Sequence, residues 1–395
     1  MSSLFYFNPT SELEIANEYP YYTASKHIEL FKKSLSIVPI YIAHADDYIL
    51  IDGEYPTTFI TQLRAYGWHI PHIITQKNIA RLKGLTFSSF EPWGWSPSVI
   101  KNIENLQMSN DFRISQLYEW NEHSKKMFSR FSAYELCKIV KDSIVESRYL
   151  SIPQLPMIVQ NLTDLQHIES KMNIPLLLKT PWSAAGKGLF KTRDRNDKSV
   201  ENQWVTAKLK EQKSLFVEPF LRKIQDVSFH FYKKGTHVTF LGVNFFKTEH
   251  NGTFKGCYLN FYNHPDYNPE IIQKEAIDEA KHTLWSSLQY LKTIEHYDGY
   301  IGIDALFFYD THDKIKLHPA IEINLRKTMG LINLQIETRV SSDSYGFWEI
   351  MPMKTYAPHT TVENTVKDGK LQSGIFPLSP TDMGGSVVIV LQLET

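Results

Sequence analysis

The sequence contains little cysteine and no long apolar run. Cys137 and Cys257 are the two cysteines among 395 residues, too few for a disulfide framework and too far apart for a zinc knuckle. No uninterrupted apolar run approaches the roughly 20 residues that a helix needs to cross a bilayer, and the first residues lack the pattern of a secretion signal. We therefore expect a cytoplasmic protein with no membrane partner.

The chain also lacks an excess of charge of either sign. Its 42 Lys and Arg residues face 43 Asp and Glu residues, which leaves a net charge of −1. Binding to nucleic acid or to anionic lipid requires a basic face or a dense Lys/Arg cluster, so we expect a small or polar partner instead. The 42% hydrophobic and 13% aromatic content argues against disorder, and the length predicts two or three packed lobes.

Residues 1–130 are predicted to form an α/β domain. The apolar runs at 37–43, 48–52 and 70–74 are typical of strands, and residues 56–63 carry a helical start signal between the last two. Alternating strands and helices are the pattern of an α/β layer structure.

Residues 131–345 are predicted to combine helices with hairpins. Ser132, with Glu135 three residues later, is expected to cap a helix that runs to Arg148. Further strands are expected at 176–179, 215–221, 227–232, 239–243, 300–309 and 316–324, with a helix at 270–291. Such pairing of neighbouring strands indicates α+β structure. After Gly330 no pattern predicts an element.

Three oxygen-bearing side chains lie on the last two predicted strands. Glu322 and Asn324 are two residues apart, so they point to the same face, and Asp304 lies on the strand before them. Carboxylate and amide oxygens suit Mg²⁺, which shares its remaining positions with water and phosphates. The alternative is that these side chains simply face solvent.

Two lysines upstream are candidates for phosphate binding. Lys179 ends a predicted strand, and Lys187 lies between Gly186 and Gly188, where the backbone can approach phosphate oxygens closely. The segment is not a Walker loop, because Pro181 stands where its first glycine would be. It also lacks the third glycine of a dinucleotide fingerprint. A Gly-Lys-Gly loop by itself is more often an exposed turn.

Three more residues suit a nucleotide and its acceptor. Glu218 can accept from the exocyclic amine of adenine while the neighbouring apolar residues, Leu221 among them, pack on the ring. Asp226 can bind ribose hydroxyls, and Arg326 can hold a phosphoryl or carboxylate group with two hydrogen bonds. Each has a simpler alternative, a surface carboxylate or a rim salt bridge.

Taken in order, these segments resemble the ATP-grasp superfamily. The segments are Leu-Leu-Leu-Lys179-Thr-Pro, Ser-Ala-Ala-Gly-Lys187-Gly, Val-Glu218-Pro-Phe-Leu, Gly302-Ile-Asp304 and Ile-Glu322-Ile-Asn324-Leu-Arg326-Lys-Thr-Met-Gly330. The resemblance covers roughly Leu150 to Gly330. It implies two α+β lobes that clasp ATP, here residues 131–345, preceded by an α/β domain at 1–130 and followed by a segment of open role at 346–395.

The resemblance also implies roles for individual residues. Lys179 and Lys187 would bind phosphates, Glu218 and the backbone around Leu221 would bind adenine, and Asp226 would bind ribose. Asp304, Glu322 and Asn324 would hold Mg²⁺, while Arg326 and Lys187 would assist the phosphoryl transfer.

The implied activity is that of an ATP- and Mg²⁺-dependent ligase. It would activate a small-molecule or peptide carboxylate as an acyl phosphate, which an amine or thiol then displaces, and a homodimer is possible. A small-molecule kinase and a nucleotide-binding module without catalysis remain open alternatives.

Some segments stay without a functional prediction. The motif Trp93-Gly94-Trp95 is expected to pack in the core or at an interface rather than to form a substrate platform, and no role is assigned to Asn8-Pro9. His44, Asp46 and Asp47 are expected to form a polar turn rather than a metal site. Candidate contacts for the acceptor substrate are four residues that are expected to face the cleft, namely Asn244, Lys247, Tyr258 and Asn260.

Overall fold

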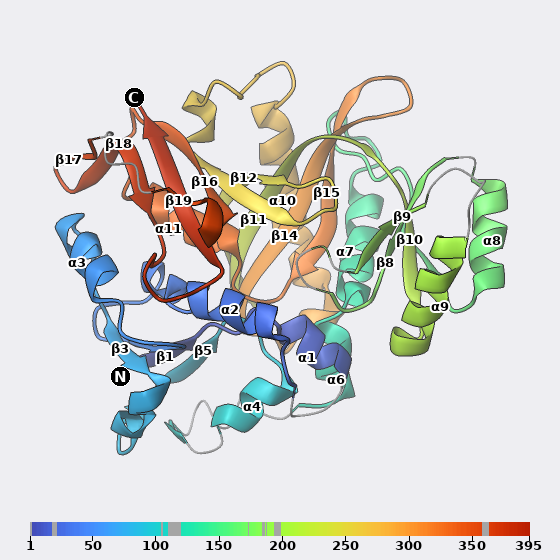
Figure 1. The fold of residues 1–395 in the computed structure, drawn as a ribbon. Coiled ribbons are helices and arrows are strands. Elements are labelled where there is room, and N and C mark those ends of the chain that lie inside the picture. Colours follow the sequence, from blue (N-terminus) through green and yellow to red (C-terminus); the bar gives the residue numbers. More distant parts are fainter. Residues whose placement is uncertain are drawn as a thin grey trace.

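The computed structural model describes residues 2–17, 22–103, 106–109, 120–172, 174–183, 186, 188–192, 199–357 and 363–395. Among these residues no helix is long and apolar enough to span a membrane. Figure 1 shows a lower layer formed by the amino-terminal residues, a large central sheet above it, and a smaller lobe on the right.

The amino-terminal residues form a parallel four-stranded sheet in the order β3-β2-β1-β5. Its strands are β1 (Ser3–Tyr6), β2 (Tyr48–Ile51), β3 (His72–Thr75) and β5 (Ser89–Pro92). The helices here are α1 (Ser11–Asn17), α2 (Lys26–Leu35), α3 (Thr57–Ala65) and α4 (Pro97–Ile103), and β4 (Thr86–Phe87) pairs with β6 (Gln107–Met108). The prediction of α/β structure is confirmed.

The prediction of a strand at 37–43 is wrong. Val38–Tyr41 form a 3₁₀ helix, in which the N–H of Ile40 donates to Ile37 O and that of Ile42 donates to Pro39 O. Pro39 has no N–H for a strand ladder, and its fixed φ suits the first turn of a helix. The run is continuously apolar because Val38 to Tyr41 are all buried.

The smaller lobe is an antiparallel sheet in the order β7-β10-β8-β9. Its elements are β7 (Met157–Val159), α8 (Leu162–Lys171), β8 (Leu176–Lys179), β9 (Leu189–Lys191), α9 (Ser199–Gln212) and β10 (Leu215–Pro219). Alternate residues such as Leu176 and Leu178 are buried together with Val205 of α9, so the helices cover one face of the sheet.

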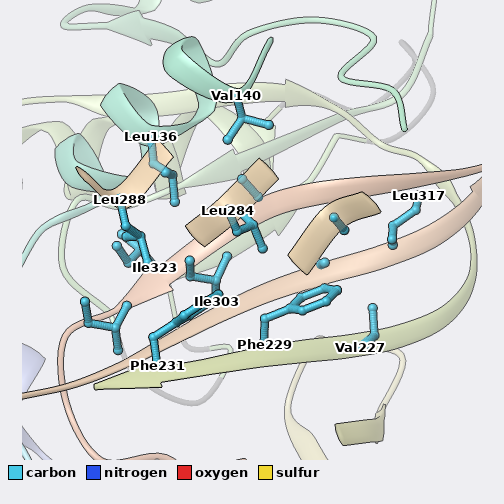
Figure 2. Packing of buried hydrophobic residues seen from close by; sticks show 14 of the residues in the cluster. Leu136, Val140, Val227, Phe229, Phe231, Leu284, Leu288, Ile303, Leu317 and Ile323 are labelled. Carbon is cyan, nitrogen blue, oxygen red and sulfur yellow. The ribbon is translucent and has the colours of Figure 1, made fainter. Parts of the chain in front are cut away.

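The central sheet has nine strands in the order β15-β14-β11-β12-β13-β16-β19-β18-β17. The first five in chain order are β11 (Arg222–Lys234), β12 (His237–Thr248), β13 (Phe254–Leu259), β14 (Gly299–Tyr309) and β15 (Ile315–Asn324). Helices α7 (Arg130–Ser143) and α10 (Lys274–Tyr290) cover one face. Figure 2 shows Phe229, Phe231 and Ile303 of that face packed with Leu136 and Leu284 of the helices.

The helix predicted at 132–148 begins and ends earlier than expected. Ser129 is the cap, since its hydroxyl accepts from Phe131 N, and the preceding helix α6 spans Glu122–Met127. Ser132 is buried and donates to Met127 O at 2.6 Å, so its hydroxyl does not cap the helix. This shift places Arg130 at the first position of α7.

The residues after Gly330 extend the central sheet. They form α11 (Met329–Glu337), β16 (Tyr345–Pro352), β17 (Thr365–Lys367), β18 (Lys370–Pro377) and β19 (Val387–Glu394). Trp348 of β16 is buried, and its Nε1 donates to Asn333 Oδ1 of α11 at 2.7 Å. Ser34 Oγ of α2 accepts from Val387 N, and Tyr41 donates to Leu378 O. These residues therefore attach the amino-terminal layer to the sheet.

Candidate active site

Asp304 and Glu322 face each other across two neighbouring strands. Asp304 of β14 pairs directly with Glu322 of β15, and Asn324 Nδ2 donates to Asp304 Oδ2 at 3.0 Å. Ile303 and Ile323 point to the opposite face, into the hydrophobic core. The strand alternation thus brings the three oxygen-bearing side chains together at one place.

The two carboxyl groups have different electrostatic environments. Burial, followed by the nearby Glu322, raises the pKa of Asp304 to about 6. Burial alone would also raise the pKa of Glu322, but Arg130 and Lys179 outweigh it and hold that pKa below its usual range. Two acidic groups in contact favour a cation between them.

Arg130 is the site residue that the sequence did not reveal. Its Nη1 lies 2.8 Å from Glu322 Oε1, its Nε donates to Thr180 O at 2.9 Å, and its Nη2 donates to Ser183 Oγ at 2.9 Å. An arginine in the first turn of a helix opposes the helix dipole. The available sequence signal was therefore an arginine placed directly after Ser129, a serine that can cap a helix.

Lys179 and Glu218 form a second charged pair. Lys179 ends β8, and its Nζ lies 2.5 Å from Glu218 Oε2 on the neighbouring strand β10. The Lys179 side chain is 4% exposed. A buried ammonium is retained in a protein only with a partner of opposite charge, and here that partner, Glu218, lines a pocket.

This first pocket, of about 490 Å³, lies between α7 and strands β10 and β15. Its lining includes Ala133, Tyr134, Cys137, Phe216, Glu218, Leu221, His318, Ala320 and Ile321, with Arg130 at one end. Burial raises the pKa of Cys137 to about 12, and burial together with Lys179 lowers that of His318 to about 3, so both side chains are neutral. The pocket lining combines apolar side chains with one carboxylate, Glu218, which suits a heterocycle that bears an amine.

A second pocket, of about 460 Å³, lies among α1, the start of α7 and the end of β15. Its lining includes Ser11, Glu12, Gly94, Trp95, Phe128, Trp182, Ser183, Glu322, Asn324 and Arg326. Arg130 lines both pockets. A ligand that spans the two pockets would therefore contact Arg130.

Arg326 is held at the second pocket by three hydrogen bonds. Its Nη2 donates to Asn324 Oδ1 at 3.1 Å, its Nη1 donates to Lys327 O at 3.1 Å, and its Nε donates to Glu12 Oε1 of α1. The adjacent Lys327 bonds to Glu91 Oε2 at 2.7 Å and Pro92 O at 3.0 Å. The amino-terminal layer thus fixes the end of β15.

The two unexplained amino-terminal motifs meet beside Arg326. Asn8 Nδ2 donates to Gly94 O at 2.7 Å, and Gly94 N donates to Asn8 Oδ1 at 3.2 Å. A Cβ at Gly94 would lie 2.2 Å from Ser11 Oγ, so this approach requires glycine. Trp93 packs in the core as predicted, whereas Trp95 lines the second pocket.

Some predicted site residues lie elsewhere. Asp226 lines neither pocket; its Oδ2 lies 2.6 Å from Lys223 Nζ and accepts from Thr248. Lys187 is outside the described residues. Asp47 accepts from the N–H groups of Ser3 and His44, which confirms the polar turn.

The four candidate acceptor contacts also line neither pocket. Asn244 is buried between His230 and Cys257, and Asn260 donates to Ser341 O and Ser344 O. Lys247 and Tyr258 both bind Asp266, on the opposite side of the sheet from Asp304. They contact protein groups rather than either pocket.

The oxygen donors of Asp304, Glu322 and Asn324 suit a metal ion that also binds waters or phosphates. Among the described residues no group of three His, Cys, Asp and Glu side chains could hold a metal ion. Two carboxylates with an amide oxygen nevertheless match Mg²⁺, which is usually bound by one or two carboxylates plus phosphates and waters.

Comparison with known proteins shows which fold carries this site. No family model and no curated protein sequence matches the chain. Among solved structures, N5-carboxyaminoimidazole synthetase from Staphylococcus aureus complexed with ADP is 12% identical, with a TM-score of 0.50 and coverage of 100% of this chain and 93% of that chain.

Two other solved structures match nearly the whole chain. The biotin carboxylase domain of Hydrogenobacter thermophilus 2-oxoglutarate carboxylase is 12% identical, with a TM-score of 0.51 and coverage of 99% and 85%. Rhizobium etli pyruvate carboxylase is 10% identical, with a TM-score of 0.54 and coverage of 99% and 35%. The chain has the ATP-grasp fold, preceded by an α/β domain, as predicted.

Proposed function

We propose that the protein is an ATP- and Mg²⁺-dependent ligase that joins a carboxylate to an amine or thiol through an acyl phosphate. The observation that carries this proposal is the pair of adjoining pockets that share Arg130. One pocket has the shape and chemistry for adenine, and the other presents carboxylates and guanidinium groups where the terminal phosphate would lie.

The nucleotide is bound by residues of several elements. Glu218 accepts from the adenine amine, and Ile321 and the backbone near Leu221 enclose the ring. Lys179 and Arg130 neutralise the phosphates, and Lys187 adds a third cation by its resemblance to the family. Asp226 keeps its proposed contact with ribose, although in this structure Lys223 is its partner.

Asp304, Glu322 and Asn324 are the residues that would hold Mg²⁺. The raised pKa of Asp304 beside Glu322 supports this, because two carboxyl groups in contact are stabilised by a divalent cation. A bound Mg²⁺ would supply positive charge that offsets the charge of the phosphate groups. In this structure Arg130 forms an ion pair with Glu322. Once another cation pairs with that carboxylate, the guanidinium can contact a phosphate instead.

The reaction proceeds in two displacements. An oxygen of the substrate carboxylate attacks the γ-phosphorus, the bond to the β–γ bridging oxygen breaks, and ADP leaves with the electron pair. The amine or thiol then attacks the acyl carbon, the carbon–oxygen bond breaks, and phosphate leaves while the nucleophile loses a proton. Arg130 and Lys179 position the phosphates, and Arg326 offsets the negative charge near the acyl phosphate.

The solved relatives support this reaction class. The Staphylococcus aureus synthetase was solved with ADP, and the biotin carboxylase domain was solved as a dimer with MgADP and bicarbonate. We accordingly propose ATP and Mg²⁺ as cofactors, small carboxylates and amines as substrates, and a homodimer in the cytoplasm as the working form.

Coupled ADP release tests the proposal. A ligase should release ADP rapidly only when an acid and an amine are both supplied, and Asp304→Ala and Glu322→Ala should abolish that release. A kinase would instead yield a stable phosphorylated product without amine. If the wild type binds nucleotide but no metabolite stimulates ADP release, the protein is a nucleotide-binding module without catalysis.

A further inference from the structure

The second pocket lies at the point where the strand order of the amino-terminal sheet reverses. In that sheet β2 and β3 lie on one side of β1, and β5 lies on the other side. A parallel sheet leaves a crevice at such a point, beyond the carboxyl ends of its strands, and ligands of α/β proteins bind there. The segments that follow β1 and β5 carry Ser11, Glu12, Gly94 and Trp95, and all four residues line the second pocket. The position of this pocket therefore indicates a substrate site.

The charged groups of the second pocket balance one another. Glu12 pairs with Arg326, and Glu322 pairs with Arg130. Three of the five N–H groups of Arg326 donate to protein oxygens. The other two make no hydrogen bond within the described part of the chain, so they can donate to a substrate carboxylate while the pair with Glu12 persists.

Three aromatic rings from separate segments converge on the same pocket. Trp95 follows β5, Phe128 lies between α6 and α7, and Trp182 follows β8. Each of these side chains is partly exposed. Because the charged groups are already paired, the aromatic rings are the largest surface that the pocket offers to a ligand.

Neighbouring groups hold the three rings in place. Trp95 meets Phe90 edge to face, with ring centroids 6.2 Å apart, and Phe128 stacks on Trp120 with centroids 5.7 Å apart and planes at 9°. Trp182 Nε1 donates to a backbone carbonyl of α6 at 3.1 Å. Rings that are fixed before binding lose little conformational freedom when a ligand arrives, so they form a prepared surface for another ring.

We propose that the second pocket binds an aromatic carboxylic acid, with its carboxylate on the free N–H groups of Arg326 and its ring against Trp95, Phe128 and Trp182. The inference rests on the proposed ligase function and specifies the class of its acid substrate. This carboxylate is the group that would be phosphorylated. Arg130 lines both pockets and is the residue that the acid and the nucleotide would both contact.

Calorimetric titration of the full chain in the presence of ADP and Mg²⁺ tests this inference. The aromatic probes are benzoate and 3-phenylpropanoate, and their saturated matches are cyclohexanecarboxylate and 3-cyclohexylpropanoate. At least one aromatic acid should bind saturably and roughly three- to tenfold more tightly than its match, because aromatic rings attract one another beyond the area they bury. The corresponding alcohol should bind roughly tenfold or more weakly than the acid, because it cannot form charge-assisted hydrogen bonds.

Variants of the pocket give a second measurement. Trp95→Leu and Trp182→Leu should each weaken binding of the aromatic acid roughly fivefold or more, whereas Trp95→Phe should retain most of it. Trp285→Leu is the matched control, because this indole is 46% exposed on α10 and lines neither pocket. It should bind the acid like wild type. Thermal unfolding verifies that each variant is folded, and the comparison of aromatic with saturated probes needs only the wild type.

The outcomes separate the inference from the proposed function. Normal binding of ADP and Mg²⁺ with no saturable binding of either aromatic acid would overturn the inference and leave the proposed function intact. Equal affinity for the saturated matches, or unchanged affinity in both leucine variants, would overturn it in the same way. Failure of the wild type to bind ADP would overturn the proposed function itself.

Discussion

Arg130 Nη1 lies 2.8 Å from Glu322 Oε1, which joins the first residue of α7 to the proposed metal site on β15. The same guanidinium binds Thr180 O and Ser183 Oγ at the end of β8. One side chain thereby connects the smaller lobe, the central sheet and both pockets. We therefore expect binding of the proposed nucleotide to change the contacts of Arg130.

Arg130→Ala should weaken MgATP binding by roughly 10- to 100-fold, because a charge-assisted contact of about 1.5–3 kcal/mol is removed. Arg130→Lys should lose less, since it keeps the charge but not the planar fork. Calorimetric titration measures both. Arg222→Ala, which removes an exposed ion pair with Asp313, is the control and should bind normally. Unchanged affinity in Arg130→Ala would remove Arg130 from the nucleotide site.

Lys179→Ala should also weaken ATP binding by roughly 10- to 100-fold, and Lys187→Ala should weaken it similarly. Lys179 is buried beside Glu218, which lines the first pocket, and in the proposed function its ammonium binds a phosphate. Lys171→Ala, at an exposed position of α8, is the matched control. Wild-type affinity in both site variants would contradict the phosphate assignment.

Asp304→Asn and Glu322→Gln should lower the affinity for Mg²⁺ in the presence of ADP by about 10- to 100-fold or more. Both substitutions keep the side-chain size and remove a negative ligand. Titration of Mg²⁺ followed by calorimetry measures the change, and nucleotide binding in chelator should persist. Asp310→Asn, in the exposed turn after β14, should leave Mg²⁺ affinity unchanged; equal affinity in all three variants would place the metal elsewhere.

Trp348→Ala should lower the free energy of unfolding by about 3–5 kcal/mol. The change opens a cavity between β16 and α11 and leaves Asn333 Oδ1 without its indole donor. Urea denaturation measures it. Tyr290→Ala, at a side chain that is 72% exposed, should stay within about 0.5 kcal/mol of wild type. A small effect of Trp348→Ala would mean that residues after 345 contribute little to the core.

Two buried histidines make stability depend on pH. Burial lowers the pKa of His230 to about 4, and burial with Lys179 lowers that of His318 to about 3, whereas unfolded imidazole titrates near pH 6.5. As pH falls below about 6.5 the unfolded chain takes up protons first. The free energy of unfolding therefore declines toward the folded pKa values, by about 2 kcal/mol per histidine at pH 5.

Urea denaturation at pH 7.5 and pH 5 checks this dependence. His318→Gln should lose about 2 kcal/mol of the difference between the two pH values. His69→Gln, at an exposed position, should keep the wild-type difference. An unchanged pH dependence in His318→Gln would show that His318 takes up its proton in the folded state as readily as in the unfolded one.

Local pattern correctly predicted much of the region proposed to bind ATP. The strand at 176–179 and the hairpin that carries Asp304 and Glu322 appear where alternation and turn residues indicated. The segment at 37–43 failed because an apolar run looks the same in a buried strand and in a buried helical turn. The strands after Gly330 were missed because no alternation or turn pattern was recognised there.

The sequence by itself determined the order of residues that resembles ATP-grasp proteins. It also determined the face on which Glu322 and Asn324 meet Asp304, because strand periodicity is a local property. The tertiary structure alone decided that Arg130 reaches Glu322 and that Glu12 holds Arg326. Those pairs join residues separated by 192 and 314 positions. Contacts at such distances depend on how lobes pack, which no spacing in a sequence encodes.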